Sequence, residues 1–176
     1  MTDDAPSATA KHTSPDRDLT MQSVTIGRPA DELYAYFRDF SNLPSFMDNV
    51  ERIDVIDDHR SHWVVKAPAG KTVEWDATVT AEEPGRSISW QSEDGADVPN
   101  SGRVTFSDAG ARGTVVSATI AYDPPAGVVG KVIAKLFQRE PAIQARRDLR
   151  RFKQLMETGE IATSSRTQAQ LQEERA

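Results

Sequence analysis

The sequence contains no cysteine. This absence excludes disulfide bonds, thiolate nucleophiles, iron–sulfur clusters and zinc sites built from cysteine, and it is compatible with a reducing compartment. No apolar run approaches the roughly 18 residues of a membrane-spanning helix. Residues 1–18 also lack the apolar stretch of a secretory signal. We therefore expect a soluble, cytoplasmic protein without a transmembrane segment.

Positive charge is also scarce, since 21 basic residues stand against 27 acidic residues and give a net charge of −6. Nonspecific nucleic-acid binding depends on Lys and Arg that neutralise phosphates, so we expect no nucleic-acid partner. The one basic run contains two pairs of arginines: Arg146, Arg147, Arg150 and Arg151. A solvated helix flank is the simplest interpretation, and contact with an acidic ligand or with an anionic membrane surface is the alternative.

Histidine is the third scarce residue. His12 lies in the polar N-terminal stretch, while His59 and His62 flank an expected hairpin. No His-x-x-x-His pair and no cluster of histidine with carboxylates is evident, so no metal site is predicted. The Gly-x-Ser-x-Gly elbow of serine hydrolases is absent as well. The sequence therefore predicts no metal, no cofactor and no catalytic residue of these kinds.

The two ends of the chain are polar. Residues 1–18 carry Pro6 and Pro15 but no apolar pattern, and the stretch from Gln168 onward has a single large apolar residue. Such segments bury too little apolar surface to fold alone. We expect one domain over residues 19–159, a disordered N-terminal tail over residues 1–18 and a flexible C-terminal tail over residues 160–176.

The period of hydrophobicity changes in order along the expected domain. Alternation predicts a first strand at about 20–27. A helix follows with Pro29 in its first turn, where a missing N–H costs little. Its apolar face consists of Leu33, Tyr34 and Phe37. Residues 42–47 are typical of a second short helix or turn.

Six more short strands are expected between residues 50 and 122, each separated from the next by turn residues. Alternation is clearest around Trp75, where apolar residues at every second position oppose Glu74 and Asp76. Such a pattern is typical of antiparallel strands with one solvated face. Tyr122 and Asp123 precede two prolines, which end the sheet because proline cannot extend a ladder.

Two helices are expected after the sheet, one at about 127–137 and a longer one at 141–158. Gly159 is well placed to cap the longer helix. Consecutive strands with segregated helices predict an α+β fold. We expect a seven-stranded antiparallel sheet wrapped around the long C-terminal helix, with two short helices after the first strand.

Local motifs occur in a recognisable order along this pattern. They are Trp90-Gln91-Ser92 with Gly95–Gly102, Gly113-Thr114 before Tyr122–Gly127, and Asp148–Glu160. Residues 19–158 resemble the START-like superfamily, also called SRPBCC or Bet v 1-like, and within it a bacterial polyketide cyclase/dehydrase-like (coenzyme Q-binding-like) subgroup. The resemblance implies a helix-grip fold with a cavity between sheet and helix for a lipid, quinone or polyketide-like aromatic. Members of the superfamily include carriers, sensors and enzymes.

Aromatic side chains are the candidates for lining such a pocket. Three tryptophans lie on the apolar register of three strands, and a tyrosine ends the last strand. Aromatic rings supply flat apolar contact, and an indole N–H or phenol O–H can orient a ligand. The candidate ligand-binding residues are Trp63, Trp75, Trp90, Tyr122, Phe46, Phe137 and Phe152. Ordinary core packing is the alternative, most of all for the phenylalanines.

The function that these observations favour is binding of a hydrophobic small molecule, as a carrier or sensor. One alternative is a metal-free cyclase or dehydratase, which requires a buried acid, tyrosine or histidine with a perturbed pKa in the cavity. The other alternative is a module whose arginine-bearing helix docks on a membrane or a partner. No motif indicates an oligomeric state.

Overall fold

A computed structural model describes residues 18–123 and 141–161 of the chain. These ranges contain the expected sheet and the expected long C-terminal helix. The helix expected at 127–137, its candidate residue Phe137 and most of both expected tails lie outside the described residues.

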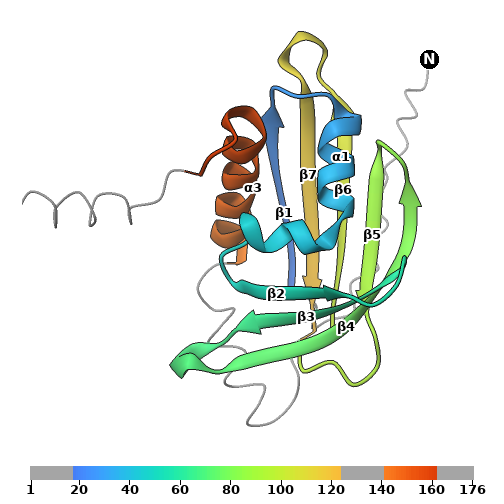
Figure 1. The fold of residues 1–176 in the computed structure, drawn as a ribbon, viewed down its shortest axis with the longest axis vertical. Helices are drawn as coiled ribbons and strands as arrows, with labels where there is room; N and C mark the ends of the chain where they lie inside the picture. Colours follow the sequence, from blue (N-terminus) through green and yellow to red (C-terminus); the bar gives the residue numbers. More distant parts are fainter. Residues whose placement is uncertain (1–17, 124–140, 162–176) are drawn as a thin grey trace, which may run out of the picture.

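The strands form one antiparallel sheet in the order β1-β7-β6-β5-β4-β3-β2. Their bounds are β1 Asp18–Ile26, β2 Val50–Val55, β3 Arg60–Lys66, β4 Thr72–Glu83, β5 Ser87–Ser92, β6 Asn100–Asp108 and β7 Thr114–Tyr122. The sheet curls strongly, so that β2 and β3 run across the direction of β1 and β7 (Figure 1). The predicted seven-stranded antiparallel sheet is confirmed.

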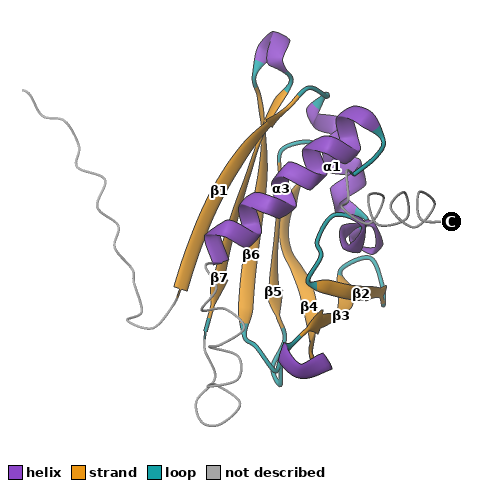
Figure 2. Ribbon diagram, turned by 90° about the vertical axis from the view of Figure 1, so that its left-hand side faces the viewer, coloured by secondary structure: helices purple, strands orange, loops and turns teal. Residues whose placement is uncertain are grey.

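The described helices lie on the concave face of this sheet (Figures 1 and 2). They are α1 Ala30–Arg38, the 3₁₀ segment η1 Phe40–Ser45 and α3 Pro141–Thr158, and two 3₁₀ turns occur at η2 Pro68–Gly70 and η3 Gly110–Arg112. The expected apolar face of α1 is buried. Gly159 ends α3 with a φ of +76°, and its N–H donates to the Leu155 carbonyl at 2.8 Å. The sequence therefore predicted both bounds of α3.

Polar contacts fasten the C-terminal half of α3 to the end of β1. The Lys153 ammonium donates to the Thr25 carbonyl oxygen at 2.6 Å and to the Glu157 carboxylate at 2.7 Å. The same carboxylate accepts the Gly27 N–H at 2.7 Å. These contacts hold the pKa of Glu157 below its usual range, the Lys153 hydrogen bond most of all. They fix the position of α3 over the sheet.

Two strand boundaries differ from expectation. β1 begins at Asp18, because its first residues pair with the end of β7. β4 continues to Glu83, past the expected alternation, because a register shift between Val79 and Ala81 keeps it paired with β5. Such bulges bend a strand without ending its ladder, and β4 accordingly follows the curl of the sheet.

Gly113 allows the β6–β7 hairpin to approach the link between β1 and α1. Its φ of +101° and its ψ of −117° lie in a region that residues with a Cβ rarely adopt. A Cβ at this position would overlap the Ile26 carbonyl oxygen and crowd the backbone of Gly27 and Arg28. Next to it, the Thr114 hydroxyl donates to the Arg28 carbonyl at 2.7 Å.

Candidate functional site

Three tryptophans form a stack on the concave face of the sheet. Trp63 on β3 is paired directly with Trp75 on β4, and their rings are 6.1 Å apart at 16°. Trp90 on β5 stacks on the other side of Trp63, at 6.3 Å and 15°. All three are 5–7% exposed. The prediction that they share the inner face is confirmed, and their contact with a ligand stays a prediction.

The inward orientation of Trp75 places its neighbours Glu74 and Asp76 on the outer face, as alternation predicted. His62 on β3 lies opposite Asp76, with its Nδ1 2.6 Å from the Asp76 Oδ1 and its Nε2 3.8 Å from the Glu74 Oε2. The expectation that no histidine–carboxylate cluster exists was therefore wrong, because the β3–β4 register joins residues distant in sequence. Within residues 18–123 and 141–161, no group of side chains is arranged to hold a metal ion.

Two of the phenylalanine candidates form the centre of the core. Phe46, just after η1, and Phe152 on α3 are completely enclosed, and their rings stack at 4.7 Å. Phe37 on α1 contacts both rings and also Trp90. Phe46 and Phe152 thus pack mainly against other aromatic side chains. This agrees with ordinary core packing, the alternative to ligand binding for these two residues.

A partly buried carboxyl group, that of Asp148, lies beside the apolar stripe of α3. Burial raises the pKa of Asp148 to about 7, although the Gln144 side-chain amide donates to it at 2.9 Å and opposes the shift. Burial, together with the charge of Asp148, raises the pKa of Tyr122 to about 12. The structure therefore brings the predicted residue Tyr122 close to an acidic group that the site prediction omitted.

A signal for Asp148 was present in the sequence. It lies three residues after Ala145 and four before Phe152, and both of these residues are buried on the inner face of α3. Residues three and four apart share a helix face, so helical spacing places Asp148 beside the apolar stripe. The surrounding arginines obscured this, because they marked the whole run as a solvated flank.

The arginines themselves lie mostly on the solvated side of α3. Arg151 contacts Asp48, and Arg146 is 3.5 Å from the side-chain oxygen of Gln22. Arg147 and Arg150 are exposed. In the part of the chain that the structure describes, no helix is long and apolar enough to cross a membrane.

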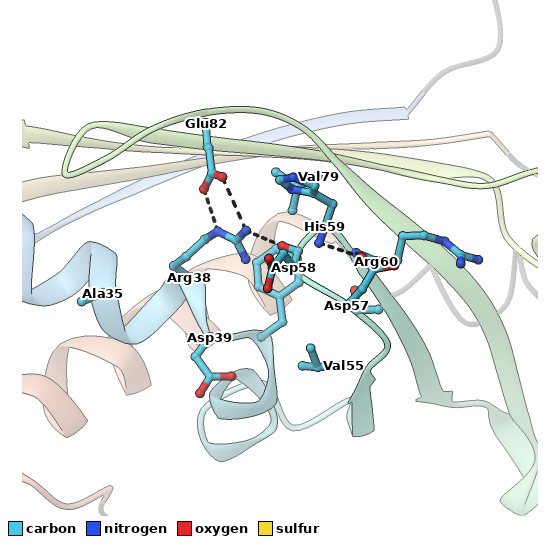
Figure 3. Close-up of a pocket in the computed structure, with 12 residues that line it drawn as sticks. Ala35, Arg38, Asp39, Val55, Asp57, Asp58, His59, Arg60, Val79 and Glu82 are labelled. Carbon is cyan, nitrogen blue, oxygen red and sulfur yellow. Dashed lines mark hydrogen bonds and ion pairs between the residues drawn. The ribbon is translucent and has the colours of Figure 1, made fainter.

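A separate groove of about 570 Å³ lies between α1, the β2–β3 turn and β4 (Figure 3). Arg38 spans it: its Nε is 2.6 Å from the Glu82 carboxylate, and its Nη2 donates to the Asp58 carbonyl at 2.6 Å (Figure 3). The Tyr34 hydroxyl donates to the same carboxylate at 2.9 Å. Arg38 holds the pKa of Glu82 below its usual range.

Charged side chains make up half of the residues that line this groove. Asp57, Asp58 and His59 of the β2–β3 turn and Arg60 at the start of β3 line the side opposite α1. The Arg60 side chain points away from Arg38 (Figure 3) and pairs with Glu93 at 2.9 Å. None of the predicted ligand-binding residues is among the side chains that line it. A hydrophobic ligand in this groove would bury the Arg38–Glu82 ion pair, which carries full charges. The inner face of the sheet, lined by apolar rings, is therefore the better candidate site.

Comparison with known proteins assigns the chain to a family. Residues 26–150 match the family described as polyketide cyclase/dehydrase and lipid transport. A 17.2 kDa protein from the melC2–rnhH intergenic region of Streptomyces lincolnensis is 32% identical over 137 residues, which are 77% of this chain and 87% of that protein.

Solved structures agree with this assignment. A Deinococcus radiodurans protein is 43% identical with a TM-score of 0.67, and the match covers 81% of this chain and 99% of that one. The Zhui aromatase/cyclase from Streptomyces sp. R1128 shares the fold, with a TM-score of 0.63 at 15% identity over 83% of this chain and 99% of its own. The resemblance inferred from the sequence is confirmed, and the chain belongs to the polyketide cyclase/dehydrase and lipid transport family.

Proposed function

We propose that the chain binds a hydrophobic small molecule between the concave face of the sheet and α3, as a carrier or sensor for a lipid, a quinone or a polyketide-like aromatic. The observation that supports this most directly is the stack of three nearly parallel indole rings on that face. Parallel rings present flat apolar surface, which favours a planar ligand. Family membership supports the same class of ligand, as fold-level analogy.

A panel of three probes tests this proposal: palmitate, decylubiquinone and the tricyclic aromatic emodin. We expect at least one to bind with a Kd in the micromolar range by isothermal titration calorimetry, and to raise the thermal midpoint. Trp90→Leu should weaken that binding at least tenfold. His59→Ala, in the charged groove, is the matched control and should leave it unchanged. Failure of all three probes to bind, or loss of binding in the groove variant alone, would contradict the proposal.

A second candidate function is a cyclase or dehydratase, and Asp148 is the observation that favours it. A carboxyl group with a pKa of about 7 can take and return a proton near neutral pH. In a dehydration, the Asp148 carboxylate would remove a proton from the carbon beside a carbonyl. The resulting carboxylic acid would then protonate the departing β-hydroxyl group, which leaves as water.

The catalytic role predicts a specific loss of activity. With a benzylic β-hydroxyketone as probe, formation of the conjugated enone is followed by its absorbance. Asp148→Asn should lower the rate by a factor of about 100 or more, the usual contribution of a general acid–base group. Asp94→Asn, on an exposed loop, should have no effect. Equal rates in both variants would remove Asp148 from the chemistry.

The raised pKa of Asp148 also predicts a pH dependence of stability. The folded protein holds this proton up to about pH 7, whereas the unfolded chain releases it near pH 4. Between these values the folded state binds more protons, so stability falls as the pH rises. Asp148→Asn removes the titration, so between about pH 4 and pH 8 its free energy of unfolding should rise relative to that of wild type by up to about 4 kcal/mol. Urea denaturation at both pH values measures this gain, and a constant difference would contradict it.

A further inference from the structure

We infer that the indole N–H of Trp75 donates a hydrogen bond to the bound ligand, so that the ligand carries an oxygen acceptor on a flat apolar body, as a quinone or an aromatic ketone does. This inference rests on the proposed function and narrows its ligand class. A saturated hydrocarbon chain offers no acceptor at this position, so it would not be the preferred ligand.

The two stacked tryptophans differ in how their N–H groups are satisfied. The Trp63 Nε1 donates to the Ser61 Oγ at 2.9 Å, and both residues are buried. The Trp75 Nε1 is closed to solvent and has no hydrogen-bond partner among the described residues. Trp75 as a whole is 7% exposed, so its N–H lies away from bulk solvent. The paired residues Trp63 and Trp75 therefore contribute one satisfied donor and one unsatisfied donor.

An unsatisfied buried donor is costly, because the N–H has lost its hydrogen bonds to water and gained none. Phenylalanine would supply an apolar ring at the same position without that cost. Native structures keep such groups rarely, and each one calls for an explanation. An acceptor on the ligand recovers the lost hydrogen bond and so favours the bound state over the free state.

Trp75 also lies at the end of the sheet where the other polar groups of the site are found. The backbone N–H of Glu74, the residue before Trp75, donates to the Asp97 carboxylate at 2.9 Å. The backbone N–H of Asp97 donates in turn to the Glu74 carbonyl at 3.1 Å. From this loop the chain enters β6, whose first residue Asn100 is paired with Tyr122. The start of β4 and the end of β7 thus meet the same loop, in the lower part of Figure 1. Trp75 and Tyr122 thus belong to the same end of the sheet, with β5 and β6 between their strands.

Matched probes and matched variants test the inference. Menadione and methylnaphthalene share a flat bicyclic body, but only menadione carries carbonyl oxygens. Because the chain has no cysteine, menadione forms no thiol adducts with it. In titration calorimetry, Trp75→Phe should weaken menadione binding about tenfold and change methylnaphthalene binding less than twofold. In wild type the Trp63 N–H is bonded to Ser61 and not to the ligand. Trp63→Phe should therefore change the affinities for menadione and for methylnaphthalene by the same factor.

Thermal denaturation of the free variants gives a second, independent readout. Both substitutions remove the same ring volume from the core and therefore both lower the midpoint. Trp75→Phe also removes an unsatisfied donor, whereas Trp63→Phe leaves the Ser61 hydroxyl buried without its partner, so the midpoint of Trp63→Phe should lie about 2–4 °C below that of Trp75→Phe. A midpoint of Trp75→Phe at or below that of Trp63→Phe would show that the Trp75 N–H is already satisfied, and would overturn the inference.

The remaining outcomes separate this inference from the proposed function. If both probes bind and Trp75→Phe weakens them equally, the inference is overturned while binding of a hydrophobic small molecule stands. If a member of the palmitate, decylubiquinone and emodin panel binds, but Trp75→Phe weakens menadione binding no more than methylnaphthalene binding, the inference is again overturned and the proposed function stands. If no probe of either set binds to wild type, both are overturned.

Discussion

Phe152→Ala is expected to lower the free energy of unfolding by about 3–5 kcal/mol, the range for removing a fully buried phenylalanine ring. The Phe152 side chain is 0% exposed and stacks on Phe46 at 4.7 Å. It also contacts Phe37 and Tyr36 of α1, at 6.1 and 6.2 Å between ring centroids. The ring therefore joins α3 to α1 and to the segment after η1, and its loss leaves a cavity at the junction of three elements.

Urea or guanidinium denaturation measures this loss. Ile143→Ala is the matched control, because Ile143 lies on the same helix but is 41% exposed. It should change the free energy of unfolding by no more than about 0.5 kcal/mol. A loss below about 1 kcal/mol in Phe152→Ala would mean that α3 contributes little to the core, contrary to the packing described above.

Gly113→Ala is expected to cost about 3 kcal/mol or more. The positive φ of this residue is strained for any side chain, and the added Cβ would overlap the Ile26 carbonyl oxygen. The backbone of β1 must then move away from the hairpin, which disturbs the Thr114–Arg28 hydrogen bond as well. Both effects act on the folded state.

Gly110→Ala separates the two contributions. Gly110 lies in the same loop with a φ of +63°, but a Cβ there would meet no atom within 4 Å. Its substitution should cost about 1 kcal/mol, the conformational penalty alone. Equal losses in the two variants, measured by chemical denaturation, would show that the hairpin moves freely and that its close approach to β1 contributes no stability.

Much of the fold could be predicted because its determinants are local. Alternation around Trp75 identified the inner and outer faces of β4, and apolar spacing with Gly159 delimited α3. Register is different, since it depends on turn lengths and on bulges such as the one between Val79 and Ala81. For that reason the pairing of His62 with Asp76 was missed.

The candidate site was predicted only in part, for a similar reason. The tryptophans share a face because alternation is a property of each strand. The polar character of the site depends instead on Asp148 and Tyr122, which tertiary packing brings together from α3 and the end of β7. The charged groove likewise depends on Arg38 reaching Glu82 across 44 positions of sequence. Helical spacing places Asp148 beside the apolar stripe of α3, but no period within a segment indicates which residue of another element it meets.

The stack of indoles has an optical consequence. The chain contains three tryptophans, and all three belong to the stack, with neighbouring rings 6.1 and 6.3 Å apart. At such separations excitation energy passes between the rings before emission. The fluorescence of the whole protein therefore comes from one coupled chromophore rather than from scattered reporters. A quinone that reaches any one ring should quench all of the emission, and a single titration then reports occupancy of the inner face directly.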